Sequence, residues 1–276
     1  MNRQCTKELR IIADTPPEQL TVEPPSILTK AFDLLHAFNH KDRVMTLTEL
    51  AQAAQLPKST VHRLLARLIE LDAVEHHGAG YKLSLRLLQL GATTPAASLR
   101  DRALPHLAGL HRWTGETVQL GVLRQFDVVY LEKLARSDSP VVLSRVGGRL
   151  PANCTAIGKA LLAWEDLDDL AALLPSPMPM LTPHSVSDVN ALITELHEIK
   201  GSELARERNE AQPGLSCVAT PIVVQGIAVA AVSVCYRSDT PFPPRVDTAL
   251  RNTATQISRE VREALGRDYR PDWRHK

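Results

Sequence analysis

The clearest pattern of hydrophobic and polar positions in the 276-residue chain lies between residues 57 and 71, in the run PKSTVHRLLARLIEL. Apolar residues recur there three and four positions apart, the spacing that places side chains on one stripe of an α-helix. The stripe consists of Val61, Leu64, Leu65 and Leu68. It predicts a helix that begins near Pro57 and buries this face against its neighbours.

The segments on either side of this helix complete a recognisable motif. Thr46 and Glu49 have the spacing of a capping box, which predicts a helix beginning at Leu47 and ending before Pro57. Two short strand-like runs, 74–77 and 81–83, are joined by a turn with two glycines. A further helix capped by Ser26 and ending near residues 40–42 supplies the third wall of a core. Together they predict a winged helix-turn-helix.

The polar face of the helix at 57–71 carries basic and hydroxyl side chains and no acid before Glu70. Such a face suits a DNA major groove, where cations meet phosphates and an arginine can read guanine. For an isolated helix an ordinary solvated face is the alternative, but the preceding turn and the following wing favour DNA binding. The residues expected to contact DNA are Lys58, Ser59, Thr60, His62, Arg63, Arg67, His77 and Lys82.

The chain after the wing changes in composition. Ser84 can cap a leucine-dense helix that runs to Gly91, with Pro95 closing the segment, and small residues follow. That helix needs an apolar partner, either within its own domain or in a second copy of the chain. We therefore expect a mobile arm at 1–25, a DNA-binding domain at 26–83, a linker helix at 84–98 and a second domain at 99–276.

The second domain shows mixed periodicities. Strands that group as hairpins and are flanked by helices predict the α+β class, with an antiparallel sheet and helices packed on it. Strands are expected at 117–123, 128–133, 141–145, 217–224 and 227–236. Helices are expected at 99–114, 157–164, 166–174, 188–200 (capped by Ser187) and 246–265.

Composition narrows the functional classes. A net charge of +1 gives no overall polyanion-binding character, so any basic function must be local. No apolar run approaches the roughly 20 residues needed to cross a bilayer. Glu8 and Asp14 interrupt the region where a signal peptide would need an apolar core. We therefore expect a cytoplasmic protein with no membrane partner.

The four cysteines, Cys5, Cys154, Cys217 and Cys235, are far apart and show no CxxC spacing. This predicts reduced thiols, with no metal site and no disulfide framework. No histidine is paired with a cysteine by linear spacing, and no phosphate-binding glycine motif occurs, so we expect no catalytic residue and no cofactor. A redox or metal sensor built on the cysteines, or a thiol enzyme, remains the alternative.

Three segments resemble the signature regions of the IclR family of bacterial transcriptional regulators: LPKSTVHRLLARL with its wing, GGRLPANCTAIGKALLA and PGLSCVATPIVVQGIAVAAVSV. The resemblance covers roughly residues 26–265. It implies a winged helix-turn-helix, a linker helix and a C-terminal GAF-like effector domain. It also implies double-stranded operator DNA as a partner, homodimers that can pair into homotetramers, and a small organic or aromatic acid as effector.

The same resemblance places the effector site. At the helix start after Pro151, the amides of Ala156, Ile157 and Gly158 are expected to point outwards and to suit a carboxylate. By resemblance Cys217 and Ser233 face the same cavity, and Glu207 matches a position where some relatives carry an acidic ligand contact. A buried acid beside an anionic ligand would repel it unless protonated or paired. The alternative is that these are ordinary core residues and a solvated helix start.

Overall fold

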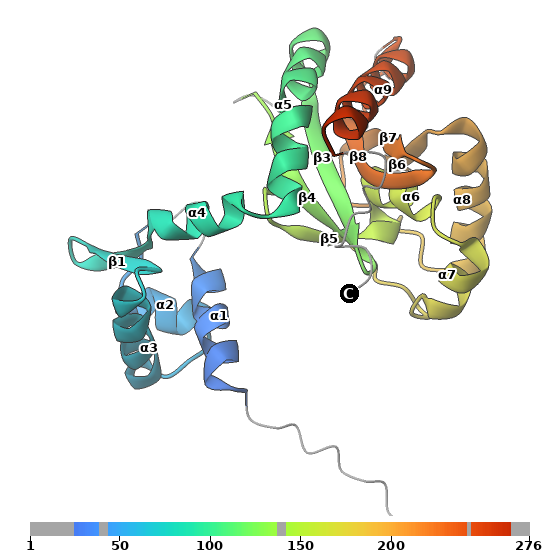
Figure 1. Ribbon diagram of the computed structural model, residues 1–276. Helices are drawn as coiled ribbons and strands as arrows, with labels where there is room; N and C mark the ends of the chain where they lie inside the picture. Colours follow the sequence, from blue (N-terminus) through green and yellow to red (C-terminus); the bar gives the residue numbers. More distant parts are fainter. Residues whose placement is uncertain (1–24, 39–43, 137–141, 242–243, 266–276) are drawn as a thin grey trace, which may run out of the picture. The chain divides into compact units, whose positions relative to one another are not determined.

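The computed structural model describes residues 25–38, 44–136, 142–241 and 244–265 (Figure 1). The chain divides into two compact units, residues 1–89 and 90–276, and each is described by itself. The division falls inside the segment expected to be a linker. The arm expected at 1–25 and the end of the first helix expected near 40–42 lie almost entirely outside the described residues. No helix in the described part of the chain is long and apolar enough to cross a membrane.

The first unit consists of helices followed by a two-stranded antiparallel hairpin. Its elements are α1 (Ile27–Ala37), α2 (Leu47–Ala53), α3 (Lys58–Glu70), β1 (Val74–His77) and β2 (Gly80–Leu83), and α4 (Leu85–Ala92) follows. This confirms the predicted winged helix-turn-helix. The capping box is complete, because Glu49 N donates to Thr46 Oγ1 at 3.3 Å and Thr46 N donates to Glu49 Oε2 at 2.7 Å.

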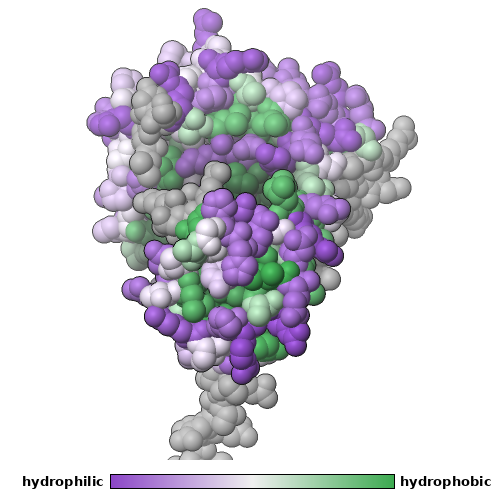
Figure 2. Space-filling view, turned by 90° about the vertical axis from the view of Figure 1, so that its left-hand side faces the viewer, coloured by the Kyte–Doolittle hydropathy of each residue, from purple (hydrophilic) through white to green (hydrophobic). Residues whose placement is uncertain are grey.

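The core of this unit is the predicted apolar stripe of α3 packed against α1, α2 and the hairpin. Several large apolar side chains nevertheless stay exposed, and Figure 2 shows such residues (green) reaching the surface between polar ones (purple). On the first unit and α4 they are Ile27, Leu28, Phe32, Val44, Leu71, Leu83, Leu85, Leu88 and Leu90.

The second unit is built on one six-stranded antiparallel sheet with strand order β5-β4-β3-β8-β7-β6. Its strands are β3 (Thr117–Arg124), β4 (Asp127–Leu134), β5 (Arg149–Pro151), β6 (Ala205–Arg208), β7 (Leu215–Val224) and β8 (Ile227–Arg237). Its helices are α5 (Pro95–Thr114), the 3-10 turn η1 (Ala152–Cys154), α6 (Ala156–Leu162), α7 (Leu167–Leu173), α8 (Val189–Ser202) and α9 (Val246–Leu265). The α+β class with an antiparallel sheet flanked by helices is confirmed.

Both faces of this sheet are buried. The helices α5 and α9 cover one face, and α6, α7 and α8 cover the other (Figure 1). Successive side chains of a strand point to opposite faces, so Cys217 lies on the α6 side and Val218 on the α5 side. This explains why β7 and β8 are apolar almost throughout instead of alternating.

The two cores differ in side-chain size. The core between the sheet and the pair α5 and α9 is mostly valine, leucine and isoleucine, whereas the α6 side is rich in alanine. The alanines of the α6 side are Ala152, Ala156, Ala160, Ala163, Ala205, Ala219, Ala228 and Ala231. Small side chains let α6 approach the sheet closely. Gly158 lets the same helix approach η1, since a Cβ there would lie 2.1 Å from the carbonyl oxygen of Ala152.

Three expectations about elements were wrong. Residues 142–145 form no strand; Lys133 Nζ donates to the carbonyl oxygens of Val142 and Ser144, so a side chain takes the place of a partner strand there. Pro95 opens α5 instead of closing the preceding segment, because proline fits the first turn of a helix. Asp188, not Ser187, caps α8, and it accepts from Ala191 N at 2.8 Å. Two short strands, β5 and β6, were also not predicted.

Candidate functional site

The polar face of α3 lies opposite its buried stripe, as predicted. Lys58, Ser59, His62 and Arg63 are exposed, and Thr60 is half-buried. Neither Lys58 nor Arg63 forms an ion pair with a described residue. α3 also begins at Pro57 without a side-chain cap, so amide groups of its first turn remain open to an anion.

The other predicted cations of this unit have acidic neighbours. Arg67 Nη1 lies 2.6 Å from Glu70 Oε2, and Lys82 Nζ lies 3.0 Å from Glu75 Oε1. These pairs are exposed, so each contributes little to stability. His77 is exposed at the end of β1 beside the hairpin turn. The least compensated positive charge of the predicted surface therefore lies on Lys58 and Arg63.

A small cavity lies on the α6 side of the sheet in the second unit. All six strands of the sheet and the start of α6 contribute to its wall. Its volume is about 10 Å³, which is room for about one water molecule. It is lined by Gln119, Tyr130, Val142, Leu143, Leu150, Thr155, Ala156, Ile157, Glu207, Ala211, Gln212, Leu215, Cys217 and Ser233.

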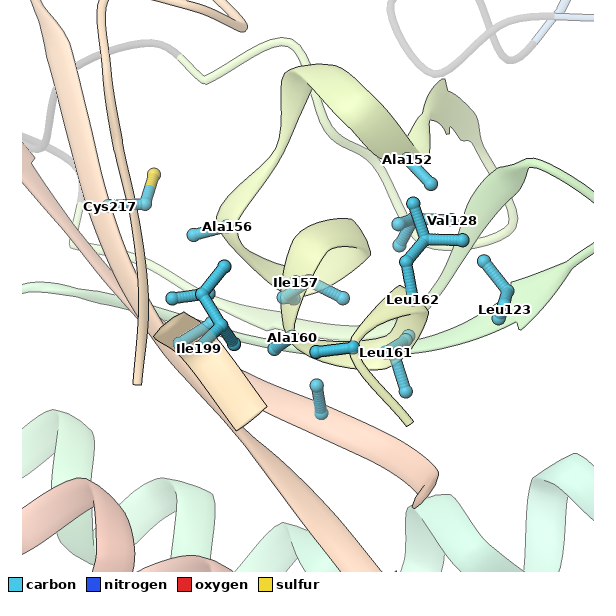
Figure 3. Close-up of a cluster of buried hydrophobic side chains, with 14 of the residues drawn as sticks. Leu123, Val128, Ala152, Ala156, Ile157, Ala160, Leu161, Leu162, Ile199 and Cys217 are labelled. Carbon is cyan, nitrogen blue, oxygen red and sulfur yellow. The ribbon is translucent and has the colours of Figure 1, made fainter. Parts of the chain in front are cut away.

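Five of the six predicted effector residues line this cavity: Ala156, Ile157, Glu207, Cys217 and Ser233. Figure 3 shows Ala156 and Ile157 at the start of α6, with Cys217 on the neighbouring strand.

The expectation that the Gly158 amide points outwards was wrong. Gly158 N donates to Thr155 Oγ1 at 3.0 Å, because Thr155 caps α6. Gly158 is also absent from the cavity wall, since it lies against the backbone of Ala152. Its role in the described structure is therefore close packing.

Sequence reasoning missed four polar residues of the wall, Gln119, Tyr130, Thr155 and Gln212. Gln119 pairs with Ser233 across β3 and β8, and Ser233 Oγ donates to Gln119 Oε1 at 3.3 Å. The hydroxyl of Ser233 is thus already partnered. A pattern that could have found Gln119 is its polar side chain within the otherwise apolar run 118–123.

Glu207 is the acidic group of the cavity, and its side chain is 3% exposed. Its Oε2 accepts from the amides of Glu210 at 3.0 Å and Ala211 at 3.4 Å. Its Oε1 is buried and has no hydrogen-bond partner among the described residues. Burial raises the pKa of Glu207 to about 7, opposed by the adjacent Cys217 thiol and the two amides.

A buried cation lies on the same side of the sheet as Glu207. Lys159 of α6 is 1% exposed, and its Nζ lies 2.9 Å from Glu195 Oε1 and 2.7 Å from Glu210 Oε2. Burial raises the pKa of Glu210, and Lys159 acts against that rise. This cluster joins α6, α8 and the loop after β6. Because Glu210 also donates its amide to Glu207, the cluster positions the wall of the cavity.

A larger cleft of about 330 Å³ lies at the β3–β4 turn. Glu165, Asp166 and Asp169 line it. Three carboxyl groups make this cleft unfavourable for an acid. It is therefore not the candidate effector site.

The cysteines do not form a catalytic or metal centre among the described residues. Cys217 Sγ lies 2.8 Å from Cys235 Sγ, and Cys154 Sγ donates to the carbonyl oxygen of Pro179. Cys154 thus lies outside the cavity wall. Burial raises the pKa of Cys217 well above its ordinary value, which disfavours the reactive thiolate. The described residues contain no group of three side chains placed to hold a metal ion.

Comparisons with known proteins agree with this geometry. Residues 27–78 match the IclR helix-turn-helix domain, and residues 92–259 match the family described as bacterial transcriptional regulator IclR C-terminal. The HTH-type transcriptional regulator KdgR of Escherichia coli (strain K12) is 32% identical, over 79% of this chain and 85% of KdgR.

Solved structures show the same similarity. An IclR homolog from Microbacterium hydrocarbonoxydans complexed with 4-hydroxybenzoate is 27% identical with a TM-score of 0.76, covering 87% of this chain and all of that one. The Thermotoga maritima IclR is 26% identical with a TM-score of 0.69, covering 85% of this chain and 98% of that one. These matched families are regulators and not enzymes. The chain belongs to the IclR family of bacterial transcriptional regulators.

Proposed function

We propose that this regulator binds a palindromic operator as a dimer, and that a small organic acid in the cavity of the second unit changes its affinity for that operator. The observation that carries the DNA half is the exposed face of α3, where Arg63 and Lys58 lie opposite the buried stripe. A helix with this division of faces can bury one side in its domain and lay the other in a major groove.

The roles on DNA follow from side-chain chemistry. The guanidinium of Arg63 reads a guanine edge, while Lys58 and the open amides at the start of α3 bind phosphate. His77 and the ion-paired Lys82 in the wing reach the neighbouring backbone. Ser59, Thr60, His62 and Arg67 complete the contact surface.

The dimer is supported by α4. None of its residues is buried, and Leu85 and Leu88 are 79% and 70% exposed. Apolar side chains exposed in this number on one short helix are suited to an interface. A second copy of the chain supplies the matching surface. Residues 84–98 serve as the linker between the two domains. Such dimers can pair into tetramers. In a two-fold dimer the two α3 helices read successive major grooves.

The effector half rests on the cavity. The amides of Ala156 and Ile157 at the start of α6 suit a carboxylate, and Ser233, Cys217 and Glu207 offer polar contacts to the remainder of the ligand. The structurally similar protein from Microbacterium hydrocarbonoxydans binds 4-hydroxybenzoate, an aromatic acid. With room for one water, the cavity must widen when an acid enters. That displacement is how the ligand favours one arrangement of the paired DNA-binding domains over another.

A mobility-shift series at fixed salt tests the DNA half, with operator fragments selected from genomic DNA by the wild-type chain. Arg63→Ala should reduce the preference for operator over random DNA by about 1–3 kcal/mol. Arg112→Ala, which removes an exposed arginine from α5, is the matched control and should change neither affinity. Equal weakening on both DNAs would restrict Arg63 to phosphate contact. No change on either would exclude α3 as the recognition helix.

One observation favours a second candidate, a redox sensor: the sulfur atoms of Cys217 and Cys235 lie 2.8 Å apart on adjacent strands. The raised pKa of Cys217 opposes it, because oxidation begins from the thiolate. Titration of free thiols before and after mild oxidation, with DNA binding followed in parallel, separates the two. A redox sensor loses two thiols and changes its DNA affinity together, whereas a metabolite sensor does not.

A further inference from the structure

The cavity has an uncompensated acid. Glu207 Oε1 is buried in its wall, and the lining side chains include no lysine, arginine or histidine among the described residues. A carboxylate charge in such surroundings is costly, because no cation among the described lining residues balances it. This arrangement is the opposite of what a simple anion-binding site would contain.

The charged and titratable groups around Glu207 do not supply the missing cation. Lys159 on α6 is a buried lysine, and its ammonium is shared by Glu195 and Glu210. That cluster carries one more negative than positive charge when both acids are ionised. The other titratable groups that interact with Glu207 are Cys217 on β7, Tyr236 on β8 and Tyr130 on β4. Cys235 lies beside Cys217.

An acid bound in this cavity must lie close to Glu207. The cavity has a volume of about 10 Å³, so even a widened form leaves little distance between a ligand carboxylate and the Glu207 carboxyl. Two carboxylates sharing an apolar site cannot both stay ionised, and one of them takes up a proton. Resting on the proposed function, we infer that the cavity binds its effector as a monocarboxylate together with one proton, which Glu207 carries on Oε1.

The protonation step is a simple transfer. Glu207 takes one proton from the buffer and forms an O–H bond at Oε1. This hydroxyl keeps its proton and donates a hydrogen bond to the ligand carboxylate, while Oε2 keeps its hydrogen bonds from the amides of Glu210 and Ala211. The charge of the cavity with ligand bound equals its charge without ligand, namely one negative. A pKa of about 7 places this proton within easy reach under neutral conditions, and an incoming anion raises the pKa further.

Two properties follow for the ligand. Apparent affinity should fall about tenfold for each unit of pH above about 7, because each binding event then takes up one proton. A dicarboxylate would need a second proton that the wall has no further acid to hold. The cavity therefore selects monocarboxylic acids whose remainder is uncharged.

Calorimetric titration measures this proton directly. The full-length protein is titrated with 4-hydroxybenzoate and with the smaller propionate in phosphate and in Tris, whose ionisation enthalpies differ, at about pH 8.5, where Glu207 starts ionised. The difference in apparent binding enthalpy between the two buffers gives the protons taken up per ligand. We expect close to one in the wild-type chain. This measurement needs no variant.

Glu207→Gln then assigns the proton. The variant should bind the same acid with no proton uptake and with an affinity that stays flat between about pH 6.5 and pH 8.5, and at the upper end it should bind more tightly than wild type. A merely structural role would weaken binding equally at every pH. Glu198→Gln, which alters an exposed acid on α8, is the matched control and should behave as wild type.

The outcomes separate the inference from the proposed function. Binding by the wild type without proton uptake overturns the inference and leaves the organic-acid site standing. Uptake that persists in Glu207→Gln also overturns it, because another group would then hold the proton. If neither acid binds at any pH, the proposed organic-acid site fails and the inference fails with it.

Discussion

Replacing Lys159 by methionine removes the positive charge from the α6 side of the sheet while keeping an unbranched side chain of similar length. Lys159 Nζ contacts both Glu195 and Glu210, and only the Glu195 side chain has appreciable access to solvent. Breaking a buried pair by removing one partner costs about 3–5 kcal/mol because the other charge stays buried and uncompensated. Since Glu195 can reach water, we expect a value near the lower end, about 3 kcal/mol.

The assay is urea unfolding followed by far-ultraviolet circular dichroism. A loss of about 3 kcal/mol moves the midpoint by about 1–1.5 M for a slope of about 2–3 kcal/mol/M. The loss should be largest at about pH 8 and shrink as the pH falls, because burial raises the pKa of Glu210 and a protonated Glu210 needs no cation. The double variant Lys159→Met/Glu210→Gln should recover part of the stability.

Lys200→Met is the matched control, since it removes a lysine from the exposed side of α8. Its ammonium lies 4.5 Å from the centre of the Trp164 ring, a contact that contributes about 0.5–1 kcal/mol at an exposed site. The midpoint should therefore move much less than for Lys159→Met. A Lys159→Met chain with the wild-type midpoint at about pH 8 would refute the buried ion pair, because no other described cation contacts Glu210.

Three further predictions concern the cavity and its wall. Gly158→Ala should lower the melting temperature, because the added Cβ clashes with the Ala152 carbonyl and overpacking costs at least about 1–3 kcal/mol of folding stability. The control Gly201→Ala has open space around it and should not lower the melting temperature. Glu207 has a pKa raised from 4.5 to about 7, so its contribution to folding is fully present below 4.5 and is lost as the pH rises through 7. Glu207→Gln should thus gain up to about 3 kcal/mol over wild type near pH 8 and lose this advantage near pH 5 in urea unfolding. Ser233→Ala should weaken binding of 4-hydroxybenzoate by about 0.5–1.5 kcal/mol in calorimetry without changing DNA affinity, and unaltered ligand binding would remove Ser233 from the site.

The sequence was informative wherever structure depends on local periodicity. The stripe on α3, the capping box at Thr46 and the hairpin at Gln225 and Gly226 each follow from neighbours a few residues apart, and both residues of that hairpin turn have positive φ angles as such turns require. The strand β6 escaped because its sequence, Ala-Arg-Glu-Arg, is mostly charged. Only pairing with β7 makes Glu207 a buried residue, and charge alone indicates an exposed one.

The cavity was harder to foresee for the same reason. Its wall draws on every strand of the sheet, so membership depends on register between residues that are up to about a hundred positions apart, such as Gln119 and Ser233. The Gly158 amide illustrates a different difficulty. A helix start offers open amides in general, but here the preceding threonine satisfies one of them, and the local sequence allowed both possibilities.

The alanine-rich wall behind α6 bears on how regulators of this kind diversify. Of these alanines Ala156 lines the cavity, so a methyl group added at Ala156 changes the shape of the space beside Glu207, while the valine and leucine layer beneath α5 and α9 stays intact. That second layer packs on the opposite face of the sheet, so a substitution at Ala156 leaves it in place. Under the proposed function, a substitution on the α6 side of the sheet can change which ligand binds, while the DNA-binding unit keeps its operator.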